Sequence, residues 1–400
     1  MKTENDNKNL NVPNLRFPEF DGEWEKVTLS KVVTRITRKN KNNESRLPLT
    51  ISAQYGLVDQ ISFFNKVVAS ADMSNYYLLK EGEFAYNKSY SSEYPWGAIK
   101  RLDRYPKGAL SSLYICFGIN DNIDSDFIMH YFESSKWHRE VSNIAGEGAR
   151  NHGLLNIAVG DFFNTSHYIP SNNKEQQKIA ALINLITARI DTQIKIIEKL
   201  ESLIRGISNN LLYSENGIHV HLGNILSERS ERTKVNNQHE VLSSTVKGIF
   251  SQREYFSKDI ASENNVGYKI IRLHDVVLSP QNLWMGNINY NDKFAIGIVS
   301  PSYKIFSIAD GYDKRFVAAI LKTHRTLYNY MLVSEQGASI VRRNLNMEAF
   351  EQLVFKIPPI DKQRKIANAI SALQSRLELE VRAKTAYEKQ KQWMLTQMFI

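Results

Sequence analysis

The sequence predicts an α+β fold made by tandem duplication of one unit, in which a strand-rich domain is followed by a long helix. A helix start recurs, as NKEQQKIAALIN from Asn173 and as DKQRKIANAIS from Asp361. Glycines and strand-like segments ahead of the two copies also match, at an offset that falls slowly from 193 residues near the first strands to 187 at the helix starts. Small loop deletions produce such a gradual drift, whereas chance matches would scatter.

Length and composition fit two globular domains of a cytoplasmic protein. The 400 residues, 42% hydrophobic and 23% charged, exceed one ordinary core. No apolar run approaches the roughly 20 residues of a membrane span, and the polar N-terminus does not have the pattern of a signal peptide. The 51 Lys and Arg against 42 acidic residues leave a charge of +9, which is compatible with nucleic acid. The single cysteine, Cys116, excludes an internal disulfide and is interpreted as a core residue rather than a nucleophile.

Each globular half is expected to be rich in strands. VTLSKVV, GEFAYN, GALSSLYICFGI and GIVSPSYKIFSI are β-branched or aromatic and are bounded by glycine or aspartate. One amphipathic helix is predicted late in each half, in SDFIMHYFESSKWHREV and KRFVAAILKTHRTLYNYM. The expected divisions are a flexible N-terminus at 1–14, a first domain at 15–170, a helix at 171–214, a second domain at 215–358 and a helix at 359–400.

The two long helices are predicted to form an antiparallel coiled coil. Apolar residues recur at steps of three and four, which is a heptad seam. Glu175 to Leu212 holds no proline and one glycine, so the first helix is about 57 Å long at about 1.5 Å per residue. Since each helix follows an equivalent domain, pairing within the chain is expected, with packing elsewhere or on partner chains as the alternatives. The seam residues are Ile179, Ile183, Ile186, Ile190, Ile194, Ile197, Ile366, Ile370, Leu373 and Leu377.

The sequence contains no recognisable catalytic or metal-binding motif. It has neither a phosphate loop nor a dinucleotide-binding glycine motif. IPPID at Ile357 lacks the asparagine and the aromatic residue of an adenine methyltransferase motif. His219 and His221 alternate on a strand-like run without a third ligand, so no metal site is expected. A duplicated enzyme should repeat its catalytic residues, and no acidic or histidine constellation is repeated, which favours a non-catalytic binding protein.

Basic and amide residues occur in three predicted loops at matching places in both halves. Sequence reading needs hydrogen-bonding groups at base edges, among lysines and arginines that hold phosphates. The loop pairs are TRITRKNKNNESR with SERSERTKVNNQ, YNKSYSSEYPWG with LSPQNLWMG, and GEGARNHGLLN with QGASIVRRNLN. Each residue could also belong to an ordinary solvated loop, but the third pair is basic in both halves and favours DNA. The candidate DNA-binding residues are Arg38, Lys39, Lys41, Arg46, Lys88, Tyr90, Arg150, Asn151, His152, Arg229, Arg232, Lys234, Gln281, Asn282, Arg342, Arg343 and Asn344.

Three features together carry a resemblance to a known family. They are the opening VPNLRFPEFDGEWEKVTLSKVV, the exits YIPSNNKEQQKIAALI and KIPPIDKQRKIANAI, and the long helix that follows each exit. In these features the chain resembles the specificity (S) subunits of type I restriction-modification enzymes, from Val12 to the C-terminus. The second copy departs from the pattern, because Lys362 stands where the first copy has Glu175.

The resemblance implies two target recognition domains joined by two spacer helices, in a subunit that has no catalytic activity. Such a subunit reads a bipartite, gapped DNA target, with one half-site per domain. The resemblance also implies two modification subunits that carry S-adenosylmethionine and methylate adenine, and two restriction subunits that use ATP and Mg; this chain itself would bind no cofactor. A stiff spacer can hold two reading domains one or two duplex turns apart, so helix length should set the gap. A standalone duplicated DNA-binding protein is the alternative, and an enzyme with an unrecognised site is a third interpretation.

Overall fold

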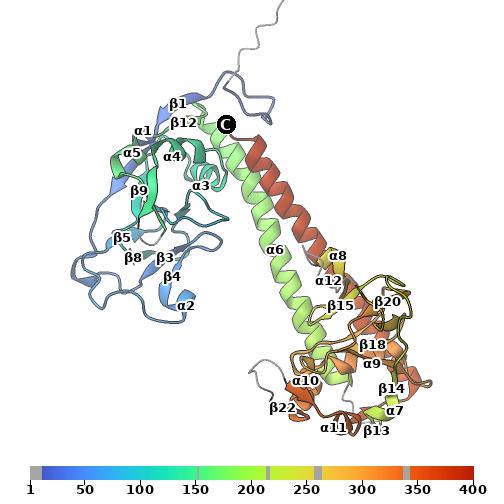
Figure 1. The fold of residues 1–400 in the computed structure, drawn as a ribbon. Coiled ribbons are helices and arrows are strands. Elements are labelled where there is room, and N and C mark those ends of the chain that lie inside the picture. Colours follow the sequence, from blue (N-terminus) through green and yellow to red (C-terminus); the bar gives the residue numbers. More distant parts are fainter. Residues whose placement is uncertain (1–10, 151–152, 213–216, 256–263, 337–342) are drawn as a thin grey trace, which may run out of the picture. The chain divides into compact units, whose positions relative to one another are not determined.

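The computed structural model describes residues 11–150, 153–212, 217–255, 264–336 and 343–400. Its contacts divide the chain into two compact units (Figure 1). Unit 1 comprises Met1–Gln193 and Ala383–Ile400, and unit 2 comprises Ile194–Arg382. Each unit therefore contains one strand-rich domain and a part of each long helix.

A four-stranded antiparallel sheet forms the centre of unit 1. Its order is β2-β9-β6-β7, with β2 at Val33–Ile36, β6 at Phe84–Asn87, β7 at Ala98–Arg101 and β9 at Ile115–Ile119. Four antiparallel strand pairs surround it. They are β1 (Glu25–Thr28) with β12 (Ser166–Ile169), β3 (Leu49–Ser52) with β4 (Gly56–Asp59), β5 (Tyr77–Lys80) with β8 (Lys107–Leu110), and β10 (Gly146–Arg150) with β11 (Leu154–Asn156).

Short helices pack on this sheet and complete an aromatic core. They are α1 (Leu29–Val32), α3 (Ser125–Glu133), α4 (His138–Ile144) and α5 (Val159–Phe163). The other short helices, η1 (Lys41–Asn43) and α2 (Gln60–Phe64), lie in loops and have no buried residue. Phe84 stacks on Phe117 with ring centroids 5.4 Å apart, and Tyr86 stacks on Phe162 at 5.0 Å. All four rings are buried, so the strand-like aromatic runs of the sequence form this core together with Phe162 of α5.

Unit 2 repeats this topology strand for strand. Its central sheet has the order β14-β21-β18-β19, which is the order of the first sheet with each strand replaced by its later copy. The elements are β13 (Ile218–His221), α7 (Leu222–Ile225), β14 (Leu226–Arg229), β15 (Leu242–Thr245), β16 (Gly248–Ser251), α8 (Gln252–Tyr255), β17 (Lys269–Arg272), β18 (Val276–Leu278), η2 (Leu283–Met285), β19 (Ile288–Tyr290), β20 (Ile296–Val299), β21 (Lys304–Ile308), α9 (Lys314–Leu321), α10 (His324–Leu332), β22 (Ser334–Gln336), β23 (Arg343–Leu345), α11 (Met347–Glu351) and β24 (Val354–Ile357). The predicted tandem duplication of an α+β domain is confirmed.

The late amphipathic segment of each half forms two helices, and the prediction of one helix is wrong in this detail. Ser134 is extended after α3, and the α4 helix begins beyond it. Thr323 is extended after α9, and its hydroxyl accepts a hydrogen bond from the Thr326 N–H to cap α10. Serine and threonine compete for backbone hydrogen bonds in this way, and they interrupt a helix whose apolar spacing continues.

Two matching glycine pairs have a physical reason. Gly97 and Gly286 have φ of +76° and +95°, a region that side chains rarely adopt. A Cβ on Gly108 would collide with Leu49, and a Cβ on Gly297 would collide with Leu242. The two leucines hold equivalent places in β3 and β15, so both copies keep the same close approach.

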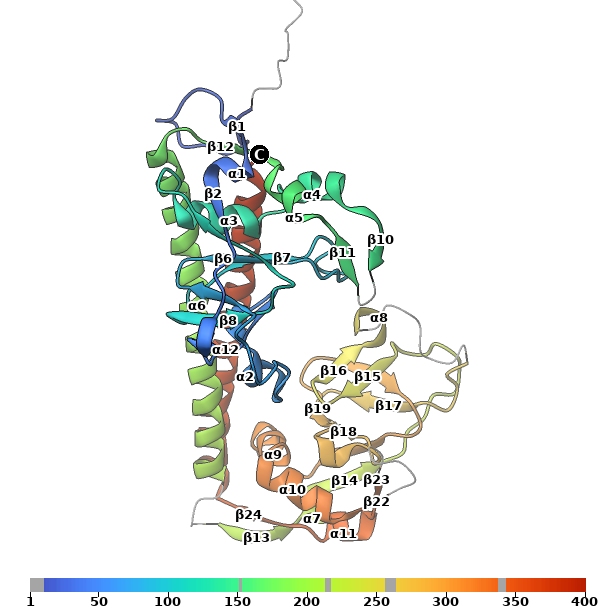
Figure 2. The ribbon, with the colours of Figure 1, turned by 90° about the vertical axis from the view of Figure 1, so that its left-hand side faces the viewer.

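The long helices are α6 (Asn173–Leu212) and α12 (Ile360–Gln397), and each runs from one unit into the other. Both views show them side by side (Figures 1 and 2). In unit 1 the start of α6 shares one core with the end of α12, because Ile179 and Ile183 cluster with Leu395 and Met398. In unit 2 the end of α6 adjoins the start of α12, with Ile207 packed against the cluster that contains Ile366. The helices are thus antiparallel within each unit.

The seam of these helices is most buried near the two domains. Ile179, Ile183, Ile186 and Ile190 are buried on α6, as are Ile366 and Ile370 on α12. The other four predicted seam residues, Ile194, Ile197, Leu373 and Leu377, are half-buried. No helix in the described ranges is long and apolar enough to cross a membrane.

Candidate nucleic-acid interface

The repeated helix start fixes each domain to its long helix through a buried glutamine. Gln176 donates from Nε2 to the Pro170 carbonyl (2.8 Å), and its Oε1 accepts from the Asp124 N–H (2.9 Å). Gln363 makes the same two bonds, to the Pro358 carbonyl (2.8 Å) and from the Asp313 N–H (2.9 Å). Asp124 and Asp313 are the N-caps of α3 and α9. The glutamine therefore joins three elements, a role that the sequence signalled by repetition but did not explain.

The second copy has Lys362 in place of Glu175 because the residues that pack on the start of the long helix differ between the two copies. In unit 1 the Glu175 carboxylate accepts from Arg16 Nε (2.7 Å) and Trp24 Nε1 (3.2 Å). The hydrogen bond that Arg16 donates to Glu175 raises the pKa of Arg16. Gly217 stands at the place of Trp24 in the second copy, and a Cβ there would press on the Ile357 carbonyl at 2.8 Å. The second copy thus lacks the tryptophan that the buried glutamate serves.

Four candidate residues of the first loop pair hold their own loops in place. The Arg38 guanidinium binds the Glu83 carboxylate at 2.6 Å, and the Arg229 guanidinium binds Asp275 at 3.0 Å. Glu83 and Asp275 are equivalent residues, just before β6 and β18. Burial raises the pKa of Asp275, although Arg229 and a backbone N–H oppose the shift.

Lys39 and Arg232 are also equivalent, and each donates to a backbone carbonyl. Lys39 Nζ lies 2.8 Å from the Asn75 carbonyl, and Arg232 Nη1 lies 2.8 Å from the Gly267 carbonyl. Lys39 also lies over the Tyr77 ring, 4.4 Å from its centroid. These contacts give both residues a positioning role in the loop that enters β5 or β17.

Lys41, Arg46 and Lys234 are exposed at the surface of these loops, as Lys39 and Arg232 are. In unit 1 the loop is held from beneath by buried Asn40, which donates to the Ser45 carbonyl (2.9 Å) and accepts from the Ser45 N–H (2.8 Å). Within the described chain, the side chains of Lys41, Arg46 and Lys234 form no hydrogen bond or ion pair. Lys41 and Lys234 are equivalent, so each unit presents one free ammonium group on a firmly held loop.

The second and third loops come together in each unit. In unit 1 the Tyr90 N–H donates to the Gly153 carbonyl (2.8 Å), and the Lys88 carbonyl accepts from the Leu155 N–H (2.9 Å). Lys88 Nζ reaches the Ile157 carbonyl (3.1 Å), whereas the Tyr90 side chain is exposed.

The same pair of loops meets in unit 2. The Arg343 N–H donates to the Gln281 carbonyl (3.1 Å), and the Arg343 guanidinium lies 4.9 Å from the centroid of the Trp284 ring. Gln281 and Asn344 are exposed, and Asn282 is half-buried. Each unit thus has one composite surface made of two loops that are distant in the sequence.

The remaining candidates belong to the third loop pair. Asn151, His152 and Arg342 lie outside the described residues, and so does the side chain of Arg150.

Among the residues that are described, no group of three or more His, Cys, Asp or Glu side chains could hold a metal ion. Cys116 is buried, and burial raises its pKa to about 12, so the thiol stays protonated in the core.

The geometry is that of a duplicated domain carried on paired helices, and solved structures with this fold are known. One is the S subunit of a type I restriction-modification system from M. genitalium, with a TM-score of 0.56, 13% identity, and coverage of 97% of this chain and 99% of that chain. Another belongs to a structure that describes complex assembly and conformational transition of the type I restriction-modification system, with a TM-score of 0.55, 14% identity and coverage of 93% and 96%. No protein-family model and no curated protein matches the chain. The similarity expected from the sequence is confirmed at the level of the fold.

Proposed function

We propose that the chain is the DNA-specificity subunit of a type I restriction-modification complex. In this role it reads a bipartite, gapped target, with one half-site for each globular domain. One observation carries the proposal: a complete domain occurs twice on an antiparallel helix pair, in a fold shared with S subunits over nearly the whole chain. Two reading domains on one spacer are what a gapped target requires.

The loops divide into residues suited to hold phosphates and residues suited to read bases. Lys41 and Lys234 are equivalent and exposed, and neither side chain has a partner among the described residues, so we assign them to the DNA backbone. Tyr90, Gln281 and Asn344 are exposed on the composite loop surface, and their amide and hydroxyl groups can meet base edges. Arg38 and Arg229 already bind carboxylates and would position the loops. Because the two composite surfaces carry different side chains, the two half-sites should differ.

The catalytic steps belong to other polypeptides under this proposal. Two modification subunits would bring S-adenosylmethionine and methylate adenine, and two restriction subunits would use ATP and Mg. Both long helices carry exposed apolar side chains that a partner could cover. They are Leu185, Ile196, Leu203, Leu379, Val381 and Trp393.

Methylome sequencing of the host with and without this chain tests the proposal. We expect one asymmetric, gapped adenine motif that disappears when the chain is deleted and returns when it is restored. The purified chain should show no methyl transfer until modification subunits are added. Methylation or cleavage by the isolated chain, or an unchanged methylome with sequence-specific binding retained, would instead favour an enzyme or a standalone DNA-binding protein.

A further inference from the structure

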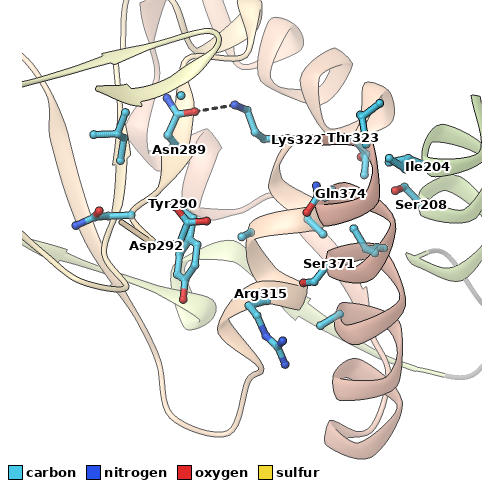
Figure 3. A pocket seen from close by; sticks show the side chains of 18 of the residues that line it. Ile204, Ser208, Asn289, Tyr290, Asp292, Arg315, Lys322, Thr323, Ser371 and Gln374 are labelled. Atoms are coloured by element: carbon cyan, nitrogen blue, oxygen red, sulfur yellow. Dashed lines mark hydrogen bonds between the residues drawn. The ribbon is translucent and has the colours of Figure 1, made fainter. Parts of the chain in front are cut away.

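Unit 2 contains a cavity of about 660 Å³ between its domain and the two long helices. Ile204 and Ser208 reach it from α6, Ser371 and Gln374 from α12, and Asn289 and Lys322 from the domain (Figure 3). Every lining residue belongs to unit 2. This volume lies in the range of small-molecule sites, which run from about 300 to 1,000 Å³.

Small side chains on α9 open the first wall of the cavity. Ala318 and Ala319 line it, whereas the equivalent residues of α3 are Met129 and His130. Met129 packs on the core of unit 1, and His130 is fully buried. The second copy therefore has two alanines where the first fills the same space with two large side chains.

Small side chains on the long helices open the opposite wall. Ser208 stands at the place of Leu395, which is buried in the core of unit 1. Ser371 stands at the place of Asn184, which binds His130 at 2.8 Å and Asp126 at 2.8 Å. At four positions that line the cavity, unit 2 has a smaller residue than unit 1. The cavity is therefore a consequence of the sequence of unit 2, and it does not depend on the placement of a single side chain.

The charge at the junction of the domain and the long helices also differs between the two units. In unit 1 the Glu133 carboxylate pairs with Lys391 at 3.0 Å. The equivalent residues of unit 2 are Lys322 and Ile204, so a cation stands where the carboxylate was and an apolar side chain where its partner was. Lys322 Nζ donates to Asn289 Oδ1 (2.7 Å) and to the Val246 carbonyl (3.3 Å). No carboxylate pairs with Lys322 anywhere in the described ranges.

The rest of the lining has an apolar floor and a basic rim. Ile204, Ile370 and Leu377 line the cavity together with the two alanines. Arg205, Lys247, Lys293, Arg315 and Lys322 line it, against the carboxylates of Asp292 and Glu378. Two of these cations also have a carboxylate outside the lining, since Arg315 lies 3.8 Å from Asp313 and Arg205 lies 4.0 Å from Glu201. Partial burial lowers the pKa of Lys322. An anion bound beside the ammonium group would raise this pKa again.

We propose that this cavity binds a small organic acid, with its carboxylate on Lys322 and its apolar part against Ile204, Ile370 and Leu377. Phosphates of a DNA duplex need no apolar floor, and a duplex is too wide to enter a cavity of this volume. The proposal rests on unit 2 alone and does not depend on the function proposed above.

Titration of the purified full chain with hexanoate, and with neutral hexanamide as the matched probe, tests the site. We expect saturable binding of hexanoate, and binding of hexanamide weaker by about tenfold or more, as a lost charged hydrogen bond predicts. Lys322→Gln should abolish this preference. Lys365→Gln, at an exposed lysine of α12 outside the cavity, should leave it unchanged.

A second test of the site uses a variant of unit 2 in which two residues that line the cavity are replaced by their equivalents from unit 1. Ser208→Leu with Ala318→Met should fill the cavity and remove hexanoate binding, with circular dichroism unchanged. Equal binding of both probes, or hexanoate binding that survives both Lys322→Gln and the filled variant, would overturn the proposal.

Discussion

The two units share one topology but differ where the domain meets the long helices. In unit 1 this junction is closed by a polar network on α3, α6, β7 and α12. Its members are Arg101, Asp126, His130, Glu133, Asn184 and Lys391. In unit 2 the equivalent junction holds a cavity lined by Lys322, which bonds Asn289 and a backbone carbonyl but pairs with no carboxylate among the described residues. The glutamine that binds backbone groups is identical in both units. Contacts to the backbone therefore preserve the topology, whereas contacts between side chains are free to diverge.

A comparison of the loops gives the same result. Equivalent carboxylates, Glu83 and Asp275, hold an arginine in each unit, and the side chains of the equivalent Lys41 and Lys234 have no partner in the part of the chain that the structure describes. The exposed residues of the composite loop surfaces have no such correspondence. The parts that support the loops are thus kept, and the parts that can contact a target differ.

The largest expected effect comes from lengthening both helices together. Seven residues inserted after Gln193 in α6 and seven after Glu380 in α12 add one heptad at equivalent, buried positions. This adds about 10 Å of helix, or about three base pairs of duplex at about 3.4 Å each. Methylome sequencing should find the gap lengthened by about three base pairs with both half-sites unchanged. An insertion into only one helix should abolish methylation, and an unchanged gap would show that the helices do not set it.

Removal of the shared glutamine should destabilise one unit and spare the other. Gln363→Leu leaves the Asp313 N–H and the Pro358 carbonyl buried without partners, at a cost of about 2–4 kcal/mol in unit 2. Hydrogen exchange of amides in α9 and in α3 measures the two units separately. Gln177→Leu, at the exposed neighbour in α6, should change the exchange of neither helix. Equal loss of protection in both units would contradict the independent roles of the two glutamines.

The polar network of unit 1 should make its stability depend on pH. Burial opposes the charge of Glu133, but His130 and Lys391 outweigh it and hold the pKa of Glu133 at about 2. Because this pKa is below its ordinary value, the stabilisation is present above about pH 4.5 and is lost as the pH falls toward 2.

Glu133→Gln should cost unit 1 about 1–3 kcal/mol at pH 7. The difference from the unsubstituted chain should shrink between pH 5 and pH 3, as measured by hydrogen exchange of α3 at each pH. Lys322→Gln, at the equivalent residue of unit 2, is the matched control and should show no such acid dependence. A constant difference across this pH range would exclude Glu133 as its source.

The smallest expected effect is that of one phosphate contact. Lys41→Ala should weaken binding to every DNA sequence by about 1 kcal/mol and lower the slope of log Kd against log salt by about one. Lys234→Ala should do the same through unit 2, and Lys365→Ala serves as the control. A change of the recognised motif at constant salt slope would instead make these lysines base readers.

The sequence predicts the duplication and the helices well, because both depend on periodicity. Ile179, Ile183 and Ile186 repeat at helical spacing, and all three are buried. The break between α9 and α10 was missed, because the cap at Thr323 works through a hydroxyl whose partner periodicity does not reveal.

The candidate site was less predictable, since charge alone does not tell a free side chain from a paired one. Arg38 and Lys41 look alike in the sequence, yet Glu83 engages the first from 45 residues away. The cavity was also beyond the sequence. It needs Ser208 of α6 and Ala318 of α9 to line one space, and only the folded chain brings them together.

The most direct test of the account is a chain with two copies of its second domain. Replacing Glu25–Ile169 by Ile218–Ile357 exchanges equivalent segments between equivalent strand ends, and it keeps both helices. Methylome sequencing of cells that carry this chain and its partner subunits should find a symmetric motif, an inverted repeat of one original half-site. Persistence of the original asymmetric motif, or its replacement by a word in which neither half is recognisable, would contradict the reading of one half-site by each domain.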